Sequence, residues 1–159
     1  MEEALGDSIR PTKAIVRKSL FQRLEPWEGR RVCDLYAGIG TLGLEAVSRG
    51  SEHVTFVEES ADAYQVLTRN VTRARITEHA ELVRQPVERF LETCRSKFEV
   101  VLADPPYGAV QWHGLWTAVA SILSPRGFFV LELPRTAQAP DDVDTRVFGK
   151  TKVCIWQGV

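Results

Sequence analysis

The chain has 159 residues, 44% of them hydrophobic, and its 20 lysines and arginines nearly balance its 21 aspartates and glutamates. This length and apolar content predict a single domain over residues 1–159, with an N-terminal arm and basic helix over 1–29 and a core over 30–159. The formal net charge of −1 excludes a nucleic-acid surface spread over the whole protein, so any such site must be a local patch.

The cysteines and the apolar pattern exclude further classes of protein. The three cysteines lie far apart, without a CxxC pair or a nearby histidine cluster, so we expect neither a disulfide framework nor a metal site. The acidic N-terminus lacks an apolar run, and nowhere do about 18 apolar residues follow one another. We therefore expect a cytoplasmic protein without a membrane partner.

The first predicted element is a basic helix. Thr12 can cap a helix that runs to about Leu24, with apolar residues at helical spacing along one face. The other face is basic, since no acid occurs between residues 8 and 24. Such a face suits either contact with RNA phosphates or simple exposure to solvent, and both interpretations stay open. Its candidate RNA-binding residues are Arg10, Lys13 and Arg17.

A glycine-rich loop follows the first strand. The apolar strand Arg31–Tyr36 leads into glycines at positions 38, 40 and 43, and a helix is predicted over residues 41–49. This order of strand, glycine turn and helix is typical of nucleotide-binding folds. Glycines let the backbone adopt positive φ and let a ligand approach closely, so a side chain at Gly38 or Gly40 should obstruct binding.

Two cofactors are compatible with this loop. The GxGxxG spacing, with Glu58 about 20 residues further on to hold a ribose hydroxyl, fits a dinucleotide. Asp34 shifts the balance, because a buried acid there repels a pyrophosphate but attracts the ammonium and sulfonium of S-adenosylmethionine. Glu59 is the alternative to Glu58 for the ribose contact.

Strands and helices continue to alternate along the chain. This alternation predicts an α/β fold with a mostly parallel seven-stranded sheet and helices on both faces. A turn is predicted at Pro125–Gly127, before the fifth strand, and an antiparallel pair should close the sheet. The strands predicted after the first are His53–Val57, Ala80–Val83, Phe98–Ala103, Phe128–Leu133, Val143–Phe148 and Lys152–Trp156; the helices are one capped by Ser60, one over Val87–Thr93 and one that includes Trp112.

The fourth predicted strand ends in a second motif, Asp104, Pro105, Pro106 and Tyr107, at the edge where such sheets bind ligands. The prolines remove two N–H donors, which leaves carbonyls free to accept hydrogen bonds from a substrate. Asp104 and the Pro105 carbonyl can accept the hydrogens of an exocyclic amine, while Tyr107 can stack on a planar base. The motif therefore predicts a site for such an amine.

The order and spacing of four stretches resemble the RsmD family of bacterial 16S ribosomal RNA guanine-N2 methyltransferases: RPTKAIVRKSLFQRL, VCDLYAGIGTLGLEAVSRG, FVEES and VLADPPYG. The resemblance covers nearly the whole chain from Arg10. It implies a Rossmann-like class I methyltransferase that uses S-adenosylmethionine, with 16S ribosomal RNA, in a small-subunit particle, as its partner. By this resemblance, the cofactor-binding residues are Asp34, Gly38, Gly40 and Glu58, and we add Tyr36 of the same motif to them. The catalytic residues that the resemblance implies are Asp104, Pro105, Pro106 and Tyr107.

One departure from the family concerns the adenine of the cofactor. The family often carries an acid after the third strand, where this chain has Gln85 and Pro86. We expect backbone groups or packing of Val87 to take its place. For the reaction, we expect direct transfer of the sulfonium methyl to the guanine amine, oriented by Asp104, without a metal or a covalent enzyme intermediate.

Three other functions stay open at this point. Another amino-methyltransferase, acting on DNA adenine or a protein glutamine, has a similar motif, although enzymes that act on glutamine usually carry Asn where this chain has Asp104. A non-catalytic RNA-binding relative would have lost cofactor binding. A nicotinamide-dependent oxidoreductase would give the motif around Asp104 no role.

Overall fold

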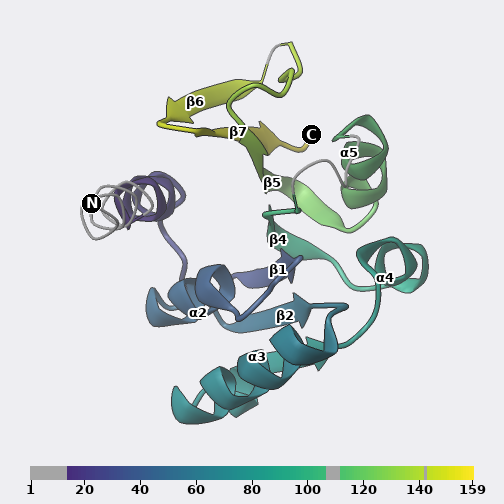
Figure 1. Ribbon diagram of the computed structural model, residues 1–159. Coiled ribbons are helices and arrows are strands. Elements are labelled where there is room, and N and C mark those ends of the chain that lie inside the picture. Colours follow the sequence, from purple (N-terminus) through teal and green to yellow (C-terminus); the bar gives the residue numbers. More distant parts are fainter. Residues whose placement is uncertain (1–13, 107–111, 142) are drawn as a thin grey trace.

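Seven strands form one sheet in the computed structural model, which describes residues 14–106, 112–141 and 143–159 (Figure 1). The strands are β1 (Arg31–Leu35), β2 (His53–Val57), β3 (Ala80–Val83), β4 (Phe98–Ala103), β5 (Leu123–Pro134), β6 (Asp144–Phe148) and β7 (Thr151–Gln157). Their order is β3-β2-β1-β4-β5-β7-β6. The strands from β3 to β5 are parallel, and β7 is antiparallel to β5 and β6. The predicted seven-stranded α/β sheet is confirmed, and it is a mixed sheet.

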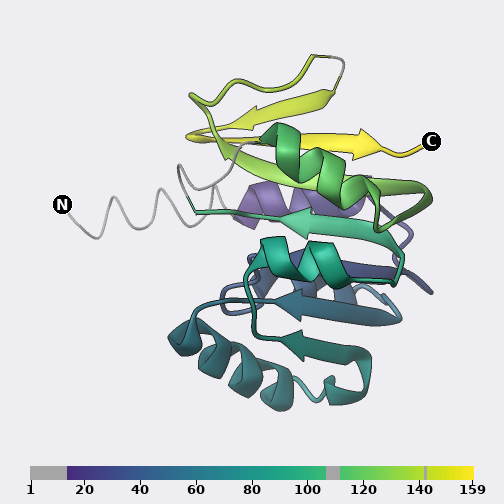
Figure 2. The ribbon, with the colours of Figure 1, turned by 90° about the vertical axis from the view of Figure 1, so that its right-hand side faces the viewer.

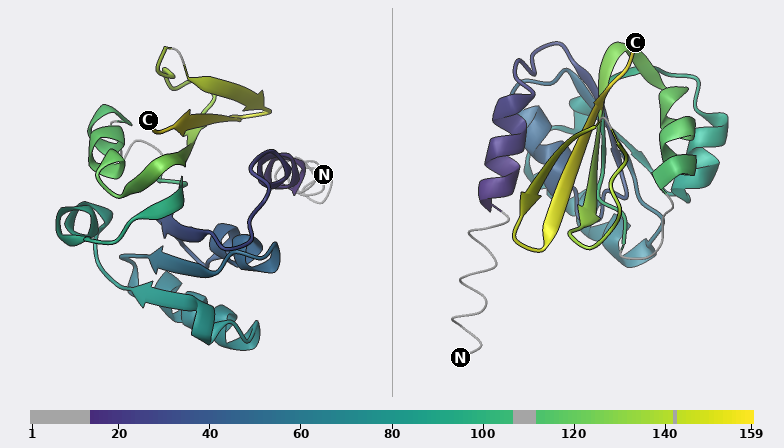
Figure 3. Two further views of the ribbon diagram at one scale, coloured as in Figure 1. Left: turned by 180° about the vertical axis from the view of Figure 1, so that it is seen from behind. Right: turned by 90° about the horizontal axis from the view of Figure 1, so that it is seen from above.

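Helices cover both faces of this sheet, as the views in Figures 2 and 3 show. Buried residues of α4 and α5 share one core cluster, and buried residues of α2, α3 and a helix over residues 14–23 share the other. We name the helix over residues 14–23 the N-terminal helix, and the sheet face beneath it, with Phe56, Leu102 and Val130, the N-helix face. The remaining helices are α2 (Thr41–Ser48), α3 (Ala61–Arg73), α4 (Val87–Thr93), α5 (Trp112–Ala120) and the short 3-10 helix Thr77–His79.

The predicted signals at helix ends act as expected. Ser60 accepts a hydrogen bond from the Ala63 N–H and so caps α3, which buries Leu67 and Val71 against the sheet. Arg49 follows the last turn of α2, and Gly50 leaves the helix with a φ of 108°. No helix in the described segments is long and apolar enough to cross a membrane.

The predicted turn at Pro125–Gly127 is wrong as a boundary, because these residues lie inside β5. Phe98 pairs with Leu123, but Val100 pairs with Phe128, so β5 carries three extra residues between two paired positions. The extra residues bulge out of the strand, and the pairing with β4 holds on both sides of them. Residues with the sequence pattern of a turn therefore form a bulge within β5 and not a boundary between two elements.

The N-terminal helix ends where the sequence predicts, since residues 14–23 are helical and Leu24 follows in a turn. Its predicted cap, Thr12, lies outside the described residues. Val16 and Leu20 are buried in the cluster on the N-helix face, and Arg23 forms an ion pair with Asp144 of β6. The helix therefore links the middle of the sheet to its closing edge.

Candidate active site

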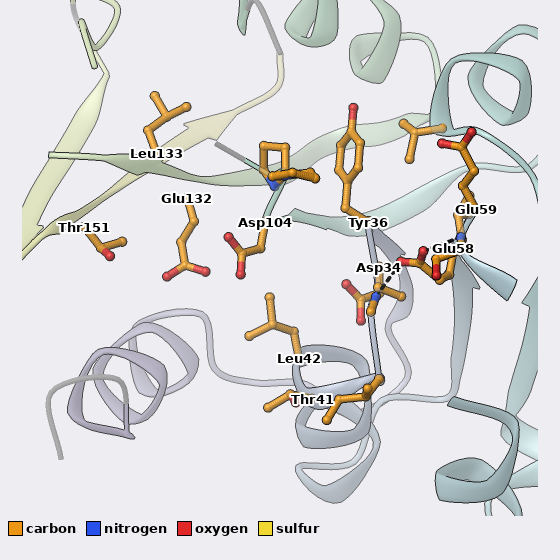
Figure 4. Close-up of a pocket in the computed structure, with 18 of the residues that line it drawn as sticks. Asp34, Tyr36, Thr41, Leu42, Glu58, Glu59, Asp104, Glu132, Leu133 and Thr151 are labelled. Carbon is orange, nitrogen blue, oxygen red and sulfur yellow. Dashed lines mark hydrogen bonds between the residues drawn. The ribbon is translucent and has the colours of Figure 1, made fainter. Parts of the chain in front are cut away.

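A cavity of about 930 Å³ opens at the carboxyl ends of the parallel strands (Figure 4). It is bordered by the glycine loop after β1, the loop after β2, the residues that follow β4, and the end of β5. The N-terminal helix contributes Val16, Arg17 and Leu20 to its wall. Both sequence motifs therefore open into one space, as their positions after parallel strands predict.

Two acids fix the glycine loop. Asp34 is only 1% exposed, and its Oδ2 accepts a hydrogen bond from the Gly43 N–H at 2.9 Å, within the first turn of α2. Glu58 accepts hydrogen bonds from the Gly38 N–H at 2.8 Å and from the Ser60 N–H at 2.7 Å (Figure 4). Glu58 thus joins the first glycine to the start of α3, so β1, α2, β2 and α3 hold one rigid loop.

The glycines of the loop serve different purposes. Gly38 has a φ of 58°, and a Cβ added there would meet no atom within 4 Å, so the space beside it is open to a ligand. Gly40 has a φ of 93°, but it does not line the cavity, and a Cβ there would lie 2.6 Å from Leu67 Cδ1. Of the two predicted contacts, only Gly38 therefore faces the cavity, whereas Gly40 makes room for α3.

The cavity is strongly acidic. Burial, opposed by the hydrogen bond from Gly43 and aided by the negative charges of Asp104 and Glu58, raises the pKa of Asp34 to about 8. Burial, together with the negative charges of Glu88 and Glu59, raises the pKa of Tyr36 to about 12. Among the described lining residues, Arg17 is the one cation, and the acids are Asp34, Glu58, Glu59, Glu88, Asp104 and Glu132.

The second motif follows β4 directly. Asp104 and Pro106 are exposed and Pro105 is half-buried, and all three line the cavity. Ala103 pairs with Leu131, so Asp104 lies beside Glu132 in the register of β4 and β5. Tyr107 lies outside the described residues, as do Arg10 and Lys13. The predicted site residues that the structure brings together around the cavity are Asp34, Tyr36, Gly38, Glu58, Asp104, Pro105, Pro106 and Arg17.

Sequence reasoning missed several lining residues. Glu88 supplies an acid three residues after Gln85, and Val87 is buried and lines the cavity, as the predicted packing against adenine requires. Glu132 lies within β5 and Thr151 begins β7, and neither was among the predicted site residues. Only the register of the sheet places these last two at the site. In the described part of the chain, no group of three or more His, Cys, Asp or Glu side chains could hold a metal ion.

Comparison with known proteins identifies the family. The model of the family described as "Conserved hypothetical protein 95" matches residues 2–157. The chain belongs to this RsmD-type family. The RsmD-type relative YlbH of Bacillus subtilis is 34% identical over 169 residues, which cover 99% of this chain and 92% of YlbH.

Two further comparisons agree with this assignment. Ribosomal RNA small subunit methyltransferase D of Escherichia coli K12 is 31% identical over 125 residues, covering 78% of this chain and 61% of the relative. The solved structure of a conserved hypothetical protein from Streptococcus pyogenes superposes with a TM-score of 0.84 at 28% identity, covering 90% of this chain and 95% of that one. The predicted resemblance to the RsmD family is thus confirmed.

Proposed function

We propose that this RsmD-type protein transfers a methyl group from S-adenosylmethionine to the exocyclic N2 amine of a guanine in 16S ribosomal RNA. One observation carries the proposal: Asp104, Pro105 and Pro106 open into the same cavity as the glycine loop. A methyl donor and an amine acceptor must meet within one space, and these two motifs border it. Membership in a family with ribosomal RNA small subunit methyltransferases supports the RNA substrate.

The residues present fit S-adenosylmethionine. The open space beside Gly38 leaves room for the cofactor against the loop backbone, and Glu58, at the carboxyl end of β2, suits a ribose hydroxyl. Asp34, at the base of the cavity, suits the ammonium group. A nicotinamide dinucleotide fits worse, because its pyrophosphate would lie among six acids.

When bound, S-adenosylmethionine supplies an activated methyl group, whose carbon bonds to N2 of guanine while the electron pair of the broken C–S bond stays on sulfur. The protein then has mainly to position the acceptor, which can contribute about 7–11 kcal/mol. Asp104 accepts a hydrogen bond from the amine and stabilises the positive charge that develops on N2, and the proton that N2 then loses passes to the solvent around the exposed Asp104. The Pro105 carbonyl is the second acceptor, and the predicted stacking of Tyr107 would fix the plane of the base.

The RNA partner would dock beside the N-terminal helix. Arg17 is half-buried in the cavity wall, and Lys18 is exposed on the same helix. Arg23 is committed to its ion pair with Asp144, which leaves Arg17 and Lys18 as the described basic residues of this helix for phosphates. We include Arg10 and Lys13 in this surface on the sequence pattern alone. A small-subunit particle is the proposed form of the substrate.

The test is transfer of labelled methyl from S-adenosylmethionine to small ribosomal subunits that lack the modification, beside naked 16S RNA, followed by nucleoside analysis. We expect N2-methylguanosine, and the preferred substrate shows whether the particle is required. Labelled N6-methyladenosine, or transfer to a protein glutamine instead, would establish one of the other amino-methyltransferases. Cofactor binding without transfer to either RNA would contradict the proposal, and no cofactor binding would favour a non-catalytic relative.

A further inference from the structure

Glu132 has no role in the function proposed so far, yet it lies beside the proposed amine site. Leu102 pairs with Val130 and Ala103 with Leu131, so the next residues in register are Asp104 and Glu132. Because side chains alternate along a strand, both carboxylates lie on the face of Leu102 and Val130, which is the N-helix face. Figure 4 shows the two carboxylates turned to the same side of the sheet, toward Leu42.

Thr151 adds a hydroxyl from the next strand. The β7 residue opposite Glu132 is Val153, and Thr151 pairs with Pro134, so it lies on the same face about 7 Å further along the strands. Thr151 and Glu132 line the same cavity as Asp104, and Glu132 is half-buried there. Across the three strands, the carboxylates of Asp104 and Glu132, which accept hydrogen bonds, are therefore followed by the hydroxyl of Thr151, as Figure 4 shows.

This order matches the hydrogen-bonding edge of guanine. That edge presents the N2 amine, the N1–H donor and the O6 acceptor in sequence, whereas adenine presents an acceptor at N1. Neighbouring strands lie about 4.8 Å apart, which is wider than the spacing of adjacent groups on this edge, so the side chains of Asp104 and Glu132 have to converge on the base to contact N2 and N1. A carboxylate opposite the N1 lone pair of adenine would be repelled, because an ionised carboxylate only accepts hydrogen bonds.

We propose that Glu132 is the residue that selects guanine, by accepting the N1–H while Asp104 accepts a hydrogen from the N2 amine and Thr151 donates its hydroxyl to O6. The inference rests on the proposed function and names how that same site recognises its substrate. Glu132 is a positioning residue, since it touches the base but not the atoms that exchange the methyl group.

The test compares guanosine with 2-aminopurine riboside at the methylated position of 16S RNA, placed by ligation and assembled into small subunits. 2-Aminopurine keeps the N2 amine but lacks both the N1–H and O6. We expect the wild-type protein to methylate guanosine with a much higher kcat/KM. Glu132→Gln should lower kcat/KM for guanosine by about 5- to 150-fold and raise the ratio of 2-aminopurine to guanosine by a similar factor, because the amide can donate to N1.

Two variants sharpen the test. Thr151→Val should slow methylation of guanosine but not of 2-aminopurine, which has no O6 to lose. Glu92→Gln, on the exposed surface of α4, should change neither substrate and serves as the matched control. Cofactor affinity should stay within twofold in every variant, which shows that the cavity is intact.

The outcomes separate the two proposals. Formation of N2-methylguanosine together with an unchanged substrate ratio in Glu132→Gln would overturn the role of Glu132 alone. Absence of N2-methylguanosine from the wild-type reaction would overturn both proposals. A ratio that shifts toward 2-aminopurine in Glu132→Gln, but not in Glu92→Gln, supports the assignment, since a merely structural role would slow both substrates together.

Discussion

Asp34 and Asp104 line the same cavity, yet Asp34 is 1% exposed and holds the Gly43 N–H, whereas Asp104 lies on the exposed surface. The segments that carry the two acids differ in the same way. The glycine loop is tied by hydrogen bonds to Asp34 and Glu58, which fix it before any ligand binds. At the other end, Asp104 and Pro106 line the same cavity but are exposed, directly after β4.

The difference follows from the size of the two proposed ligands. A small cofactor can enter a closed cradle, so the residues that hold it can also be part of the core. A base that belongs to a large RNA must reach its site from outside, so the residues that receive it have to remain at the surface. Substitutions at the buried end should therefore affect folding and cofactor binding together, while those at the exposed end should affect catalysis alone.

The largest expected effect is at the exposed end. Asp104→Ala should lower kcat by about 10²- to 10⁴-fold, because it removes the group that orients the amine. Cofactor affinity, measured by calorimetry, should stay within a few-fold, and so should the unfolding midpoint. An equal loss of cofactor binding and transfer would show that the two ends are not independent and would remove Asp104 from its proposed place at the substrate.

Two glycines at the buried end should affect folding and cofactor binding to different degrees. In Gly43→Ala the new Cβ would lie 2.3 Å from Phe56 Cε1, so we expect a loss of about 1–3 kcal/mol in the free energy of unfolding. Gly38→Ala meets no neighbour within 4 Å, so its cost is the strain of a φ of 58°, about 1 kcal/mol, while cofactor affinity should fall because the methyl occupies ligand space. Denaturation and cofactor titration of both variants check this. Unchanged cofactor affinity in Gly38→Ala, or a larger loss of stability there than in Gly43→Ala, would contradict the distinction.

Asp34 predicts a pH dependence of cofactor binding. With its pKa at about 8 in the free protein, the carboxyl is mostly neutral at pH 6, and an ammonium binds best to the ionised form. The affinity for S-adenosylmethionine should therefore rise by about tenfold from pH 6 to pH 7, with uptake of the cation releasing a proton.

Two controls isolate this effect. Asp34→Asn keeps an acceptor for the Gly43 N–H but has no charge, so its affinity should be weaker and nearly flat over the same range. Methylthioadenosine lacks the amino acid group, so its binding to the wild-type protein should also be flat. The raised pKa further implies that the stability of the free protein falls as the pH rises from about 4 toward 8, because the unfolded chain ionises first. If the cofactor affinity of the wild-type protein did not change with pH, the proposed contact between Asp34 and the ammonium group would be wrong.

The smallest expected effect is at the rim. Arg17→Ala should weaken RNA binding by a few-fold and lower the slope of log affinity against log salt by about one unit, as loss of one phosphate contact does. Arg73→Ala is the matched control, since Arg73 is exposed at the end of α3, away from the N-terminal helix, and does not line the cavity. An unchanged slope in Arg17→Ala would leave the basic helix as ordinary solvated surface.

Much of this arrangement could be predicted from local sequence. The bounds of β2, β3 and β4 agree with the prediction to the residue, because buried parallel strands are short apolar runs with polar or turn residues at their ends. Both motifs follow such strands, so their meeting at one edge of the sheet was predictable from topology alone.

The missed features depend on contacts between strands. Pro125 and Gly127 have the chemistry of a turn, but pairing with β4 on both sides makes them part of β5. The same three-residue shift decides which residue of β5 lies beside Asp104, so Glu132 could not be placed by counting along the sequence. The sequence pattern likewise predicts that Gly40 contacts the ligand, and only its close approach to Leu67 shows that it makes room for α3.

The N-terminal helix shares its core cluster with Val153 and Ile155 of β7 and is joined to β6 by the Arg23–Asp144 pair. During synthesis of the chain, its apolar side therefore has no complete partner surface until the last two strands have left the ribosome. Since this helix also forms a wall of the cavity, a nascent chain cannot complete its active site early. Until then, Val16 and Leu20 lack the part of their core cluster that β7 supplies.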